Sequence, residues 1–517
     1  MAEMILPAPT VARAPAEKLK AGELNLLDTT AIATASVAPA YSLGTTLFLV
    51  VAATGVGLAA PAAILVSFFP VFFIALAYSY MNRKDPNCGA SYSWIARTLN
   101  PYVGWFTGWV QLAANVIFCI SAPLFAGAVL LALLGPGQFG WITAGVAGNT
   151  ALIALVAFGL LAIVTWMVAR GIRITANAQW VMVTIEYLVI LGFSVLALVK
   201  VLSSHPHGSI MVAGSWFNPF SLQGITGLSA GAVLGVFFFW GWDTAANLNE
   251  EGTDNRENPG RAGLISMGIL LVLFLLAATA MQSLLGEAQI NRQGANALTF
   301  FASQLVPAPL SFLMAVAILS SSLATTQTTL LPSSRLSLSM ARDGVFPRMF
   351  AVIHRSWQTP WVGTVVTFLL CSVGILLTTV NSNVNTTFGS MISDIGILVA
   401  LYYGATGIAC AWAFRRVLLR SPVTLVLAGI LPALGGLFLF WIGYQVVAQG
   451  VGAAVPVLIT VGLGIPLTAL AAVTNRTGFF TMKPVAYEEV GAGVDLKGVF
   501  ARTAPRQAEE AEETAAV

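Results

Sequence analysis

The sequence predicts an all-α integral membrane protein with twelve transmembrane helices. Its 517 residues are 57% hydrophobic and 9% charged, with a mean hydropathy of +0.84, whereas a soluble domain is usually about 25% charged. A membrane helix needs roughly 20 apolar residues, and twelve apolar stretches of suitable length follow one another along the chain. The first and the sixth are interrupted at their centres by residues that disturb a helix.

The expected spans are spaced evenly, with polar tails at both ends. We place them at 30–56, 60–80, 103–134, 148–169, 176–200, 225–248, 262–285, 308–333, 360–380, 390–414, 423–446 and 451–473. Residues 1–28 form a polar N-terminal tail, and the apolar run behind it is too long for a cleavable signal peptide. Residues 476–517 form a second polar tail that ends in EEAEET, which we expect to be disordered and dispensable.

The distribution of basic residues predicts the orientation. If the N-terminus is cytoplasmic, only Lys200 and Arg292 of the 24 lysines and arginines fall in outer loops. Cytoplasmic enrichment of Lys and Arg is the main orientation signal, so we expect both termini inside. The alanine- and glycine-rich composition suits a bacterial inner membrane. A net charge of +3 gives no reason to expect a nucleic-acid partner.

The first span contains the stretch SVAPAYSLG at residues 36–44. A proline inside a helix removes a backbone donor and clashes with the preceding turn. In lipid, the freed backbone groups are tolerated only where they are buried in protein or line a cavity. An ordinary proline kink is the alternative interpretation.

The sixth span contains a second interruption, GVFFFWGWDTAANLNEE at residues 235–251. Here Gly241 precedes an intramembrane acid, Asp243. Breaks at matching places in two halves indicate a transporter built from inverted repeats, with its substrate site between them. We therefore expect residues 29–200 and 225–414 to be inverted repeats joined by an extracellular loop at 201–224, with backbone unwound near 38–43 and 240–245.

Three segments carry a resemblance to a known family. WGWDTAANLNEE, NRENPGRA (255–262) and TTQTTLLPSSRLSLSMARDGVFPRMFAVIH (325–354) resemble the sixth helix, the loop after it and the eighth helix with its following loop in the amino acid–polyamine–organocation (APC) superfamily of transporters. The resemblance covers about residues 24–475. It implies the LeuT-like 5+5 inverted-repeat fold with discontinuous helices 1 and 6, helices 11 and 12 (415–475) outside the repeat, and alternating access without a cofactor.

The first break departs from the family pattern. Pro39-Ala40-Tyr41 stands where many members have Gly-Ser-Gly, whose backbone N–H groups and helix dipole bind a substrate carboxylate. Proline has no N–H and tyrosine fills space, so an anion nest is limited to Tyr41, Ser42 and Leu43. This favours substrates recognised more by their amine than by a carboxylate. The residues expected to line the substrate at this break are Ala38, Pro39, Ala40, Tyr41 and Ser42.

Three acids fall inside predicted spans, where buried charges are costly and are functional candidates. Glu186 has apolar neighbours. Members of the resembled family often carry a lysine linked to proton coupling at this position, and the glutamate here reverses the charge. We expect Glu186 to take up and release a proton, unless it is a structural protonated carboxyl. Asp243 is a candidate for substrate binding and for coupling. Asp394 lies near the outer end of span ten, where a capping or snorkelling carboxylate is the simpler interpretation.

Further candidates have equally plausible structural interpretations. Trp240 and Trp242 flank Gly241 and can stack on an ammonium group, or can serve as core residues. Asn115 falls where the resemblance places the substrate cavity, with a hydrogen bond between helices as its rival. Ser320 and Ser321, followed by a third serine, are an alternative sodium site by resemblance to sodium-driven relatives. No other metal site is expected.

Three other classes of protein fit the sequence less well. A major-facilitator transporter would carry a G-x-x-x-D-R-x-G-R-like loop after span two and a long central loop. An intramembrane enzyme would need a catalytic constellation at membrane depth, and the three histidines lie in loops. A nutrient sensor of the same fold would usually add a soluble domain.

We therefore expect a permease that imports a small amino-group-bearing metabolite together with protons. A substrate exchanger and a sodium symporter are the alternatives. The expected partners are this substrate, protons and membrane lipid, and the expected state is a monomer or weak homo-oligomer.

Overall fold

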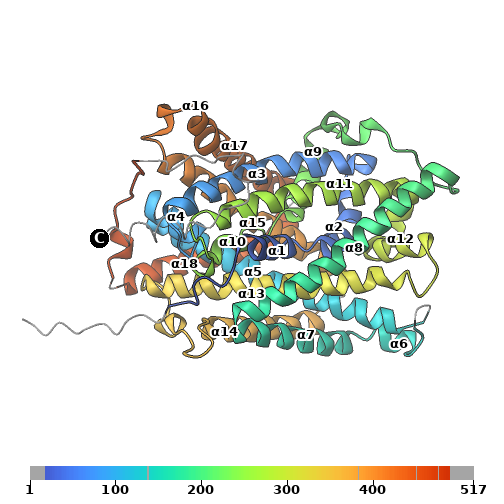
Figure 1. Cartoon of the computed structure of the whole chain (residues 1–517), viewed down its shortest axis with the longest axis horizontal. Coiled ribbons are helices and arrows are strands. Elements are labelled where there is room, and N and C mark those ends of the chain that lie inside the picture. Colours follow the sequence, from blue (N-terminus) through green and yellow to red (C-terminus); the bar gives the residue numbers. More distant parts are fainter. Residues whose placement is uncertain (1–17, 137–138, 382–383, 450, 476, 489–517) are drawn as a thin grey trace, which may run out of the picture.

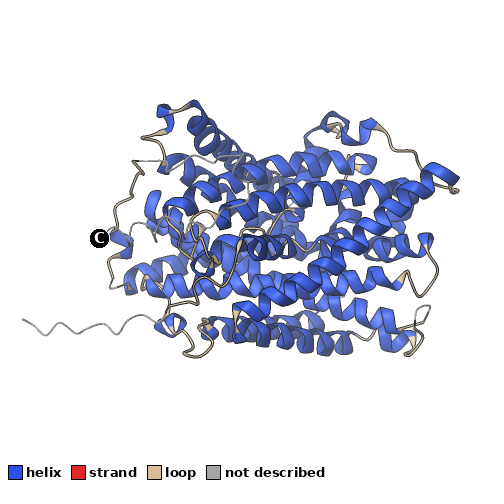
Figure 2. Cartoon of the chain, in the orientation of Figure 1, coloured by secondary structure: helices blue, strands red, loops and turns tan. Residues whose placement is uncertain are grey.

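The fold is a bundle of helices that cross the molecule side by side (Figure 1). The computed structural model describes residues 18–136, 139–381, 384–449, 451–475 and 477–488. Within these ranges the chain consists of helices and loops (Figure 2), and its one β-bridge joins Leu24 to Gly252. Eleven helices of the described chain are long and apolar enough to cross a membrane, and the sixth predicted span adds the shorter apolar helix Gly224–Phe238. The predicted all-α membrane fold is confirmed.

The helices fall into two sets of corresponding order, each opening with a broken helix. The first set contains α1 (Leu26–Ser36), α2 (Pro39–Ala52), α3 (Ala60–Lys84), α5 (Pro101–Leu134), α7 (Thr150–Arg170) and α8 (Ile172–Ser204). The second contains α9 (Gly224–Phe238), α10 (Thr244–Asn247), α11 (Asn258–Gln293), α13 (Phe312–Arg342), α14 (Trp361–Asn381) and α15 (Val384–Ala413). Helices α17 (Leu431–Gln449) and α18 (Val451–Thr474) follow, and α4 (Ser91–Thr98), α6 (Ala144–Ala147), α12 (Ala297–Leu305) and α16 (Pro422–Thr424) connect longer helices. That the two sets superpose as inverted repeats stays a prediction.

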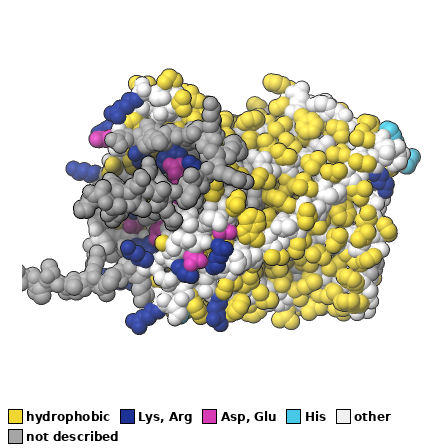
Figure 3. Space-filling view, viewed as in Figure 1, with side chains coloured by type: hydrophobic (Ala, Val, Ile, Leu, Met, Phe, Trp, Pro, Cys, Tyr) yellow, Lys and Arg dark blue, Asp and Glu magenta, His cyan; other side chains and the backbone are white. Residues whose placement is uncertain are grey.

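The two ends of the bundle differ in charge. We call the end at which α1 begins and α13, α15 and α18 end the terminal face, and the opposite end the far face. Lys and Arg gather at the terminal face, at the left of Figure 3, whereas hydrophobic side chains cover most of the remaining visible surface. Leu155, Leu188 and Leu376 are among the exposed apolar residues of this surface. A surface of this kind is suited to contact with lipid.

Local sequence explains where helices begin and how they pack. Asn25 caps α1 by accepting a hydrogen bond from the Asp28 N–H at 2.9 Å, and the Asp28 carboxylate accepts one from the Asn25 N–H, which is a capping box. Small residues let α15 and α17 approach closely, because a Cβ atom at Gly436 would lie 2.6 Å from the Gly404 carbonyl oxygen. Close contact through small residues is a common way for membrane helices to associate.

Part of the C-terminal tail is ordered on the terminal face. Phe479 and Phe480 are buried, and the ring of Phe479 stacks on Tyr92 with 5.8 Å between centroids. Further on, the Val485 N–H donates to the Arg97 carbonyl and the Tyr487 N–H donates to the carbonyl of residue 413. The prediction of a disordered tail is therefore wrong for residues 477–488, because aromatic side chains anchor them. Residues 489–517 lie outside the described ranges.

Candidate functional site

The first break lies between α1 and α2, at Val37 and Ala38. Ala38 adopts a left-handed conformation (φ 54°, ψ 64°), and α2 starts directly afterwards with Pro39 as its first residue. Proline is favoured at this position, because the N–H it lacks would have had no partner within the helix. The prediction of unwound backbone over 38–43 is therefore wrong beyond residue 38. The proline begins a helix instead of interrupting one.

The carbonyl groups freed by this break find partners within the protein. The Ser36 carbonyl accepts a hydrogen bond from the Thr325 hydroxyl at 2.9 Å, and the Val37 carbonyl accepts one from the Ser42 hydroxyl at 2.9 Å. The Ser42 N–H donates to the Ala38 carbonyl at 2.7 Å. Ser42, which we predicted to line the substrate, is thus engaged with the backbone on both its N–H and its hydroxyl.

The second break lies between α9 and α10, at residues 239–243, in agreement with the prediction of 240–245 to within two residues. Gly241 has φ +115°, a conformation that residues with a side chain rarely adopt. A Cβ atom built on Gly241 would lie 2.4 Å from the Ser36 carbonyl oxygen. The two breaks therefore meet at the centre of the bundle, and Gly241 makes this contact possible.

Glu186 caps the N-terminal end of α2. The Ala40 N–H and the Ser321 hydroxyl both donate to its Oε1 atom, each at 2.6 Å. The Tyr41 N–H in turn donates to the Ser321 hydroxyl oxygen at 3.1 Å. A carboxylate at this position is stabilised by the free N–H groups and by the dipole of the helix. Glu186 is fully buried, and its other oxygen, Oε2, has no hydrogen-bond partner among the described residues.

The anion nest expected from Tyr41, Ser42 and Leu43 is not free for a ligand. The Tyr41 N–H is bound to Ser321, the Ser42 N–H is bound to Ala38, and the Leu43 N–H lies inside the first turns of α2. The N–H that does meet a carboxylate belongs to Ala40. The prediction of a nest from these three residues is wrong, because the helix starts four residues earlier than Leu43.

Asp243 lies in a pocket of tyrosine hydroxyls. Tyr403 donates to Oδ1 at 2.9 Å and Tyr402 donates to Oδ2 at 3.0 Å, with the Tyr78 hydroxyl 3.5 Å from Oδ2. The carboxyl is buried, with 3% of the residue exposed. Tyr402 also accepts a hydrogen bond from the Trp240 indole N–H at 2.7 Å. Asp243 is therefore connected to Trp240 through one phenol.

These three tyrosines were not among the predicted site residues. Tyr402 and Tyr403 lie in α15, and Tyr78 lies in α3, so each is far from Asp243 along the chain. The available signal was the pair of adjacent tyrosines inside span ten, since a buried phenol usually needs a hydrogen-bond partner. Nothing local indicated which partner they have.

The two tryptophans beside Gly241 point into different surroundings. The Trp240 ring contacts Phe118 edge to face, with centroids 5.3 Å apart. Trp242 instead packs between Tyr78 and Tyr403, with centroids 4.9 and 5.6 Å away. The structure thus places Trp240 on the side of α5 and Trp242 among α3, α11 and α15.

Tyr41 and Asn115 share the Trp240 side of the breaks. The Tyr41 ring makes edge-to-face contacts with Phe118 at 5.5 Å and with Phe125 at 5.3 Å. Asn115 lies one turn before Phe118 on α5, buried, and its Nδ2 has no hydrogen-bond partner in the described chain. Together with Trp240 these residues form what we call the aromatic site: Tyr41, Asn115, Phe118, Phe125 and Trp240.

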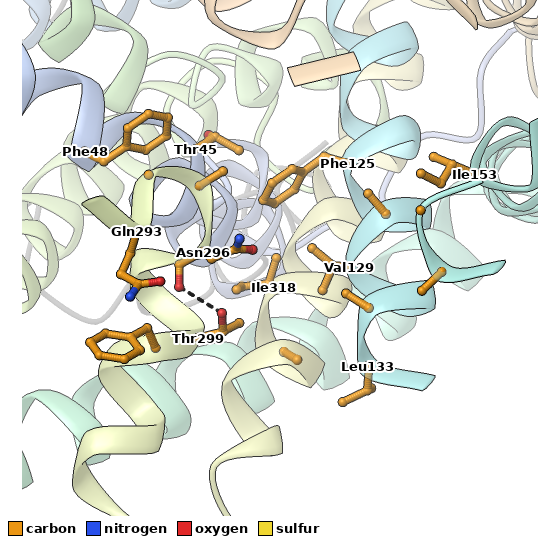
Figure 4. Close-up of a pocket in the computed structure, with 18 of the residues that line it drawn as sticks. Thr45, Phe48, Phe125, Val129, Leu133, Ile153, Gln293, Asn296, Thr299 and Ile318 are labelled. Atoms are coloured by element: carbon orange, nitrogen blue, oxygen red, sulfur yellow. Dashed lines mark hydrogen bonds between the residues drawn. The ribbon is translucent and has the colours of Figure 1, made fainter. Parts of the chain in front are cut away.

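A cavity of about 1020 Å³ lies at the far face and shares Phe125 with the aromatic site. It lies between α2, α5, α7, α12 and α13, and Figure 4 shows Thr45, Phe125 and Ile318 around it with Gln293, Asn296 and Thr299 on the α12 side. Phe125 links the two, because it lines the cavity and also contacts Tyr41. None of the described residues that line the cavity is charged.

The serines of the alternative sodium site are already hydrogen-bonded. Ser321 is bound to Glu186 and Tyr41, while the Ser320 hydroxyl donates to the Met182 carbonyl at 3.2 Å. Asp394 is buried in α15, with 5% of the residue exposed, and its Oδ1 has no partner among the described residues. A snorkelling Asp394 is therefore wrong, because its carboxyl does not reach the surface.

Ion pairs close the bundle at the terminal face, and the segments that carry the family resemblance supply them. Arg335 forms a two-pronged pair with Glu251 at 3.0 and 2.9 Å, and both side chains are fully buried. Arg342 pairs with Glu250 at 2.9 Å. Burial opposes the charged form of Glu250, but the Arg342 guanidinium outweighs it and holds the pKa of that carboxyl below its usual range.

Removal of the buried Arg335 charge is expected to destabilise the protein strongly. Arg335→Met leaves Glu251 as an unpaired buried carboxylate, which typically lowers the free energy of unfolding by about 3–5 kcal/mol. Thermal unfolding in detergent measures the effect. Arg416→Met, which breaks an exposed pair with Glu488, is the matched control and should change little. Adding Glu251→Gln to Arg335→Met should recover part of the loss, and an unchanged unfolding temperature for Arg335→Met would contradict the prediction.

Comparisons with known proteins agree with this architecture. The model of the amino acid permease family matches residues 24–469. The chain is 25% identical over 342 residues to the methylthioribose transporter of Bacillus subtilis (strain 168), a match covering 64% of this chain and 70% of that protein. It is 22% identical over 340 residues to the low-affinity putrescine importer PlaP of Escherichia coli (strain K12), with the same coverage.

A third relative is the branched-chain amino acid permease BcaP of Bacillus subtilis (strain 168), 24% identical over 367 residues that cover 68% of this chain and 74% of that protein. The family model spans both breaks, the helix that carries Glu186 and the ion pairs of the terminal face. The chain belongs to the amino acid permease family, within the amino acid–polyamine–organocation superfamily.

Proposed function

We propose that this permease imports a small amine-bearing metabolite across a bacterial inner membrane by alternating access, driven by protons. The observation that carries the proposal is Glu186, a buried carboxyl at the broken first helix that has no ion-pair partner among the described residues. Burying an unpaired anion is costly, so binding of a proton or of another cation is favoured at this carboxyl. Of the substrates named for the relatives, putrescine and branched-chain amino acids bear an amino group and are candidates, whereas methylthioribose bears none.

The substrate is proposed to bind in the aromatic site, between the two breaks. An ammonium group there would face the Trp240 ring. It would also be attracted by the negative charge of Asp243, which is connected to Trp240 through the Tyr402 hydroxyl. Tyr41 offers an aromatic surface against which the substrate can pack, and the Asn115 Nδ2 offers a hydrogen-bond donor. Of the other residues predicted to line it, Ala38, Pro39 and Ala40 shape the break itself. Trp242 packs against Tyr78 and Tyr403, whose hydroxyls face Asp243.

The orientation in the membrane is proposed from the charges on the two faces. Because cytoplasmic loops carry most Lys and Arg, the terminal face is proposed to be cytoplasmic. The cavity then opens to the outside, while the ion pairs of Arg335 and Arg342 close the inside. Glu186 would take up a proton from outside, and the substrate would bind from the same side. Opening of the terminal face would then release the proton and the substrate to the inside.

The first test concerns Asp243. Asp243→Asn removes the buried negative charge that would act on the substrate ammonium through Tyr402. Charge-assisted hydrogen bonds such as the one from Tyr402 contribute about 1.5–3 kcal/mol, so uptake into liposomes should weaken by about tenfold or more. Asp394→Asn changes another buried aspartate of the bundle, outside the two breaks, and should transport normally. Transport by Asp243→Asn with unchanged affinity and unchanged pH dependence would make Asp243 a structural residue.

The alternatives give different results in the same liposomes. An exchanger would need a counter-substrate inside, and a sodium symporter would accumulate substrate only with a sodium gradient. A sensor would bind the substrate without moving it.

A further inference from the structure

The N-terminal end of α2, where a substrate carboxylate would bind, is already filled by the protein itself. Pro39 has no N–H, the Ala40 N–H is bound to Glu186, and the Tyr41 N–H is bound to Ser321. The next N–H, of Ser42, closes the turn onto Ala38. No N–H group of the first turn remains free for a ligand.

The second observation is the sign of the charge at the centre of the bundle. Glu186 and Asp243 are both buried there, and neither has an ion-pair partner in the described part of the chain. The buried Arg335 lies further along α13, toward the terminal face, and is held by Glu251. A substrate carboxylate would therefore meet two acids and no cation, and like charges in a medium of low dielectric repel each other strongly.

The third observation concerns the groups of the aromatic site that can contact a substrate. The edges and faces of Tyr41, Phe118 and Trp240 suit an apolar body and an ammonium group. The unpartnered Asn115 Nδ2 can bind an oxygen or sulfur of the substrate. The described residues that line the neighbouring cavity include no cation that would attract an anion.

We infer that Glu186 serves as a built-in carboxylate at the broken first helix, and that the substrate is consequently a small amine without an α-carboxylate. The inference rests on the proposed function and narrows its substrate class. It holds for either protonation state of Glu186, because a protonated carboxyl still occupies the Ala40 N–H and the space in front of it. An α-amino acid would have to displace Glu186 from the helix in order to bind.

Matched pairs of ligands test the inference on the wild-type protein. Each pair consists of an amine and the α-amino acid that differs from it by one carboxylate: isoamylamine and leucine, putrescine and ornithine, tyramine and tyrosine. Binding is measured by thermal shift at increasing ligand concentration, and transport by counterflow in liposomes. At least one amine should half-saturate at a concentration tenfold or more below its amino acid. Leucine methyl ester, which is one methyl group larger than leucine but lacks its negative charge, should bind better than leucine.

Variants at Glu186 separate its charge from the space it fills. Glu186→Gln keeps an oxygen on the Ala40 N–H and resembles the protonated carboxyl, so an amine should still bind better than its amino acid. Glu186→Ala frees the N–H group, so that an amino acid supplies the missing carboxylate and the preference should disappear or reverse. Glu287→Gln, at an exposed glutamate of α11, is the matched control and should keep the wild-type ratio.

The results that would overturn the inference are distinct from those that would overturn the proposed function. A wild-type protein that binds an amino acid as well as its amine contradicts the inference alone, because the permease function would stand. The same holds if Glu186→Ala folds and keeps the wild-type ratio. If none of the amines or amino acids is bound or carried, the proposed amine permease fails and the inference fails with it. A misfolded variant leaves the wild-type comparison to decide.

Discussion

Replacing Gly241 by alanine is expected to abolish transport and to destabilise the fold. The backbone of Gly241 has φ +115°, and an added Cβ would lie 2.4 Å from the Ser36 carbonyl oxygen. Cβ atoms in proteins essentially never lie closer than 3.0 Å to another heavy atom of this kind. A residue held in such a conformation costs about 1–3 kcal/mol, and here the clash adds to it. The neighbouring atom belongs to the backbone, so no side-chain rotation can relieve the contact.

The clash would also separate the two breaks. The Ser36 carbonyl is the acceptor for Thr325, so moving it disturbs the contact between α1 and α13. Gly268→Ala is the matched control, because a Cβ at Gly268 in α11 meets nothing within 4 Å. Thermal unfolding and liposome uptake measure both variants. Normal uptake by Gly241→Ala would show that the second break is not fixed against the first.

Comparison of the two breaks shows what a sequence can indicate about such a site. Gly241 indicated the second break correctly, because a glycine close to an acid in mid-membrane suits an interrupted helix better than a continuous one. Pro39 indicated a break but not its position, since proline both ends one helix and begins the next. The prediction placed the proline inside the unwound segment, whereas the structure places it at the start of α2.

The partners of the buried acids could not be predicted from sequence. Glu186 binds an N–H group 146 residues away, and Asp243 binds hydroxyls 159 and 160 residues away. Both acids were identified as candidates because burial of a charge is costly anywhere in a membrane. Their partners depend on how α2 and α13 pack against Glu186 and how α3 and α15 pack against Asp243, and hydrophobic patterns contain no information on that geometry. The anchored residues 477–488 were missed for the same reason, since Phe479 and Phe480 stand in a polar segment.

Glu186→Gln is expected to uncouple transport from the proton gradient while leaving exchange intact. Glutamine has nearly the same shape as a protonated glutamate, and its amide oxygen can accept the hydrogen bonds from the Ala40 N–H and the Ser321 hydroxyl. The variant therefore resembles the protein with its proton permanently bound. The substrate can still move in either direction, but no proton is taken up outside or released inside.

The size of the effect follows from the driving force. A gradient of one pH unit is worth about 1.4 kcal/mol for each coupled proton, which supports about tenfold accumulation. Wild-type liposomes with an acidic exterior should reach this ratio at zero membrane potential and lose it with a protonophore. Glu186→Gln liposomes should reach equal concentrations on both sides, with counterflow of preloaded substrate at close to the wild-type rate.

Replacing sodium by choline at constant pH decides between the two cations. Proton coupling at Glu186 predicts no change in wild-type accumulation. Accumulation that requires sodium and ignores pH would transfer the coupling role to Ser320 and Ser321, whose hydroxyls lie beside Glu186 and Met182 on α8. Glu186 would then be a ligand or a neighbour of the ion, since its Oε2 is the atom of this cluster without a hydrogen-bond partner in the described chain. In that case Glu186→Gln should weaken the response to sodium, and Ser321→Ala should abolish it, because Ser321 is the residue that holds both the carboxyl and the first turn of α2.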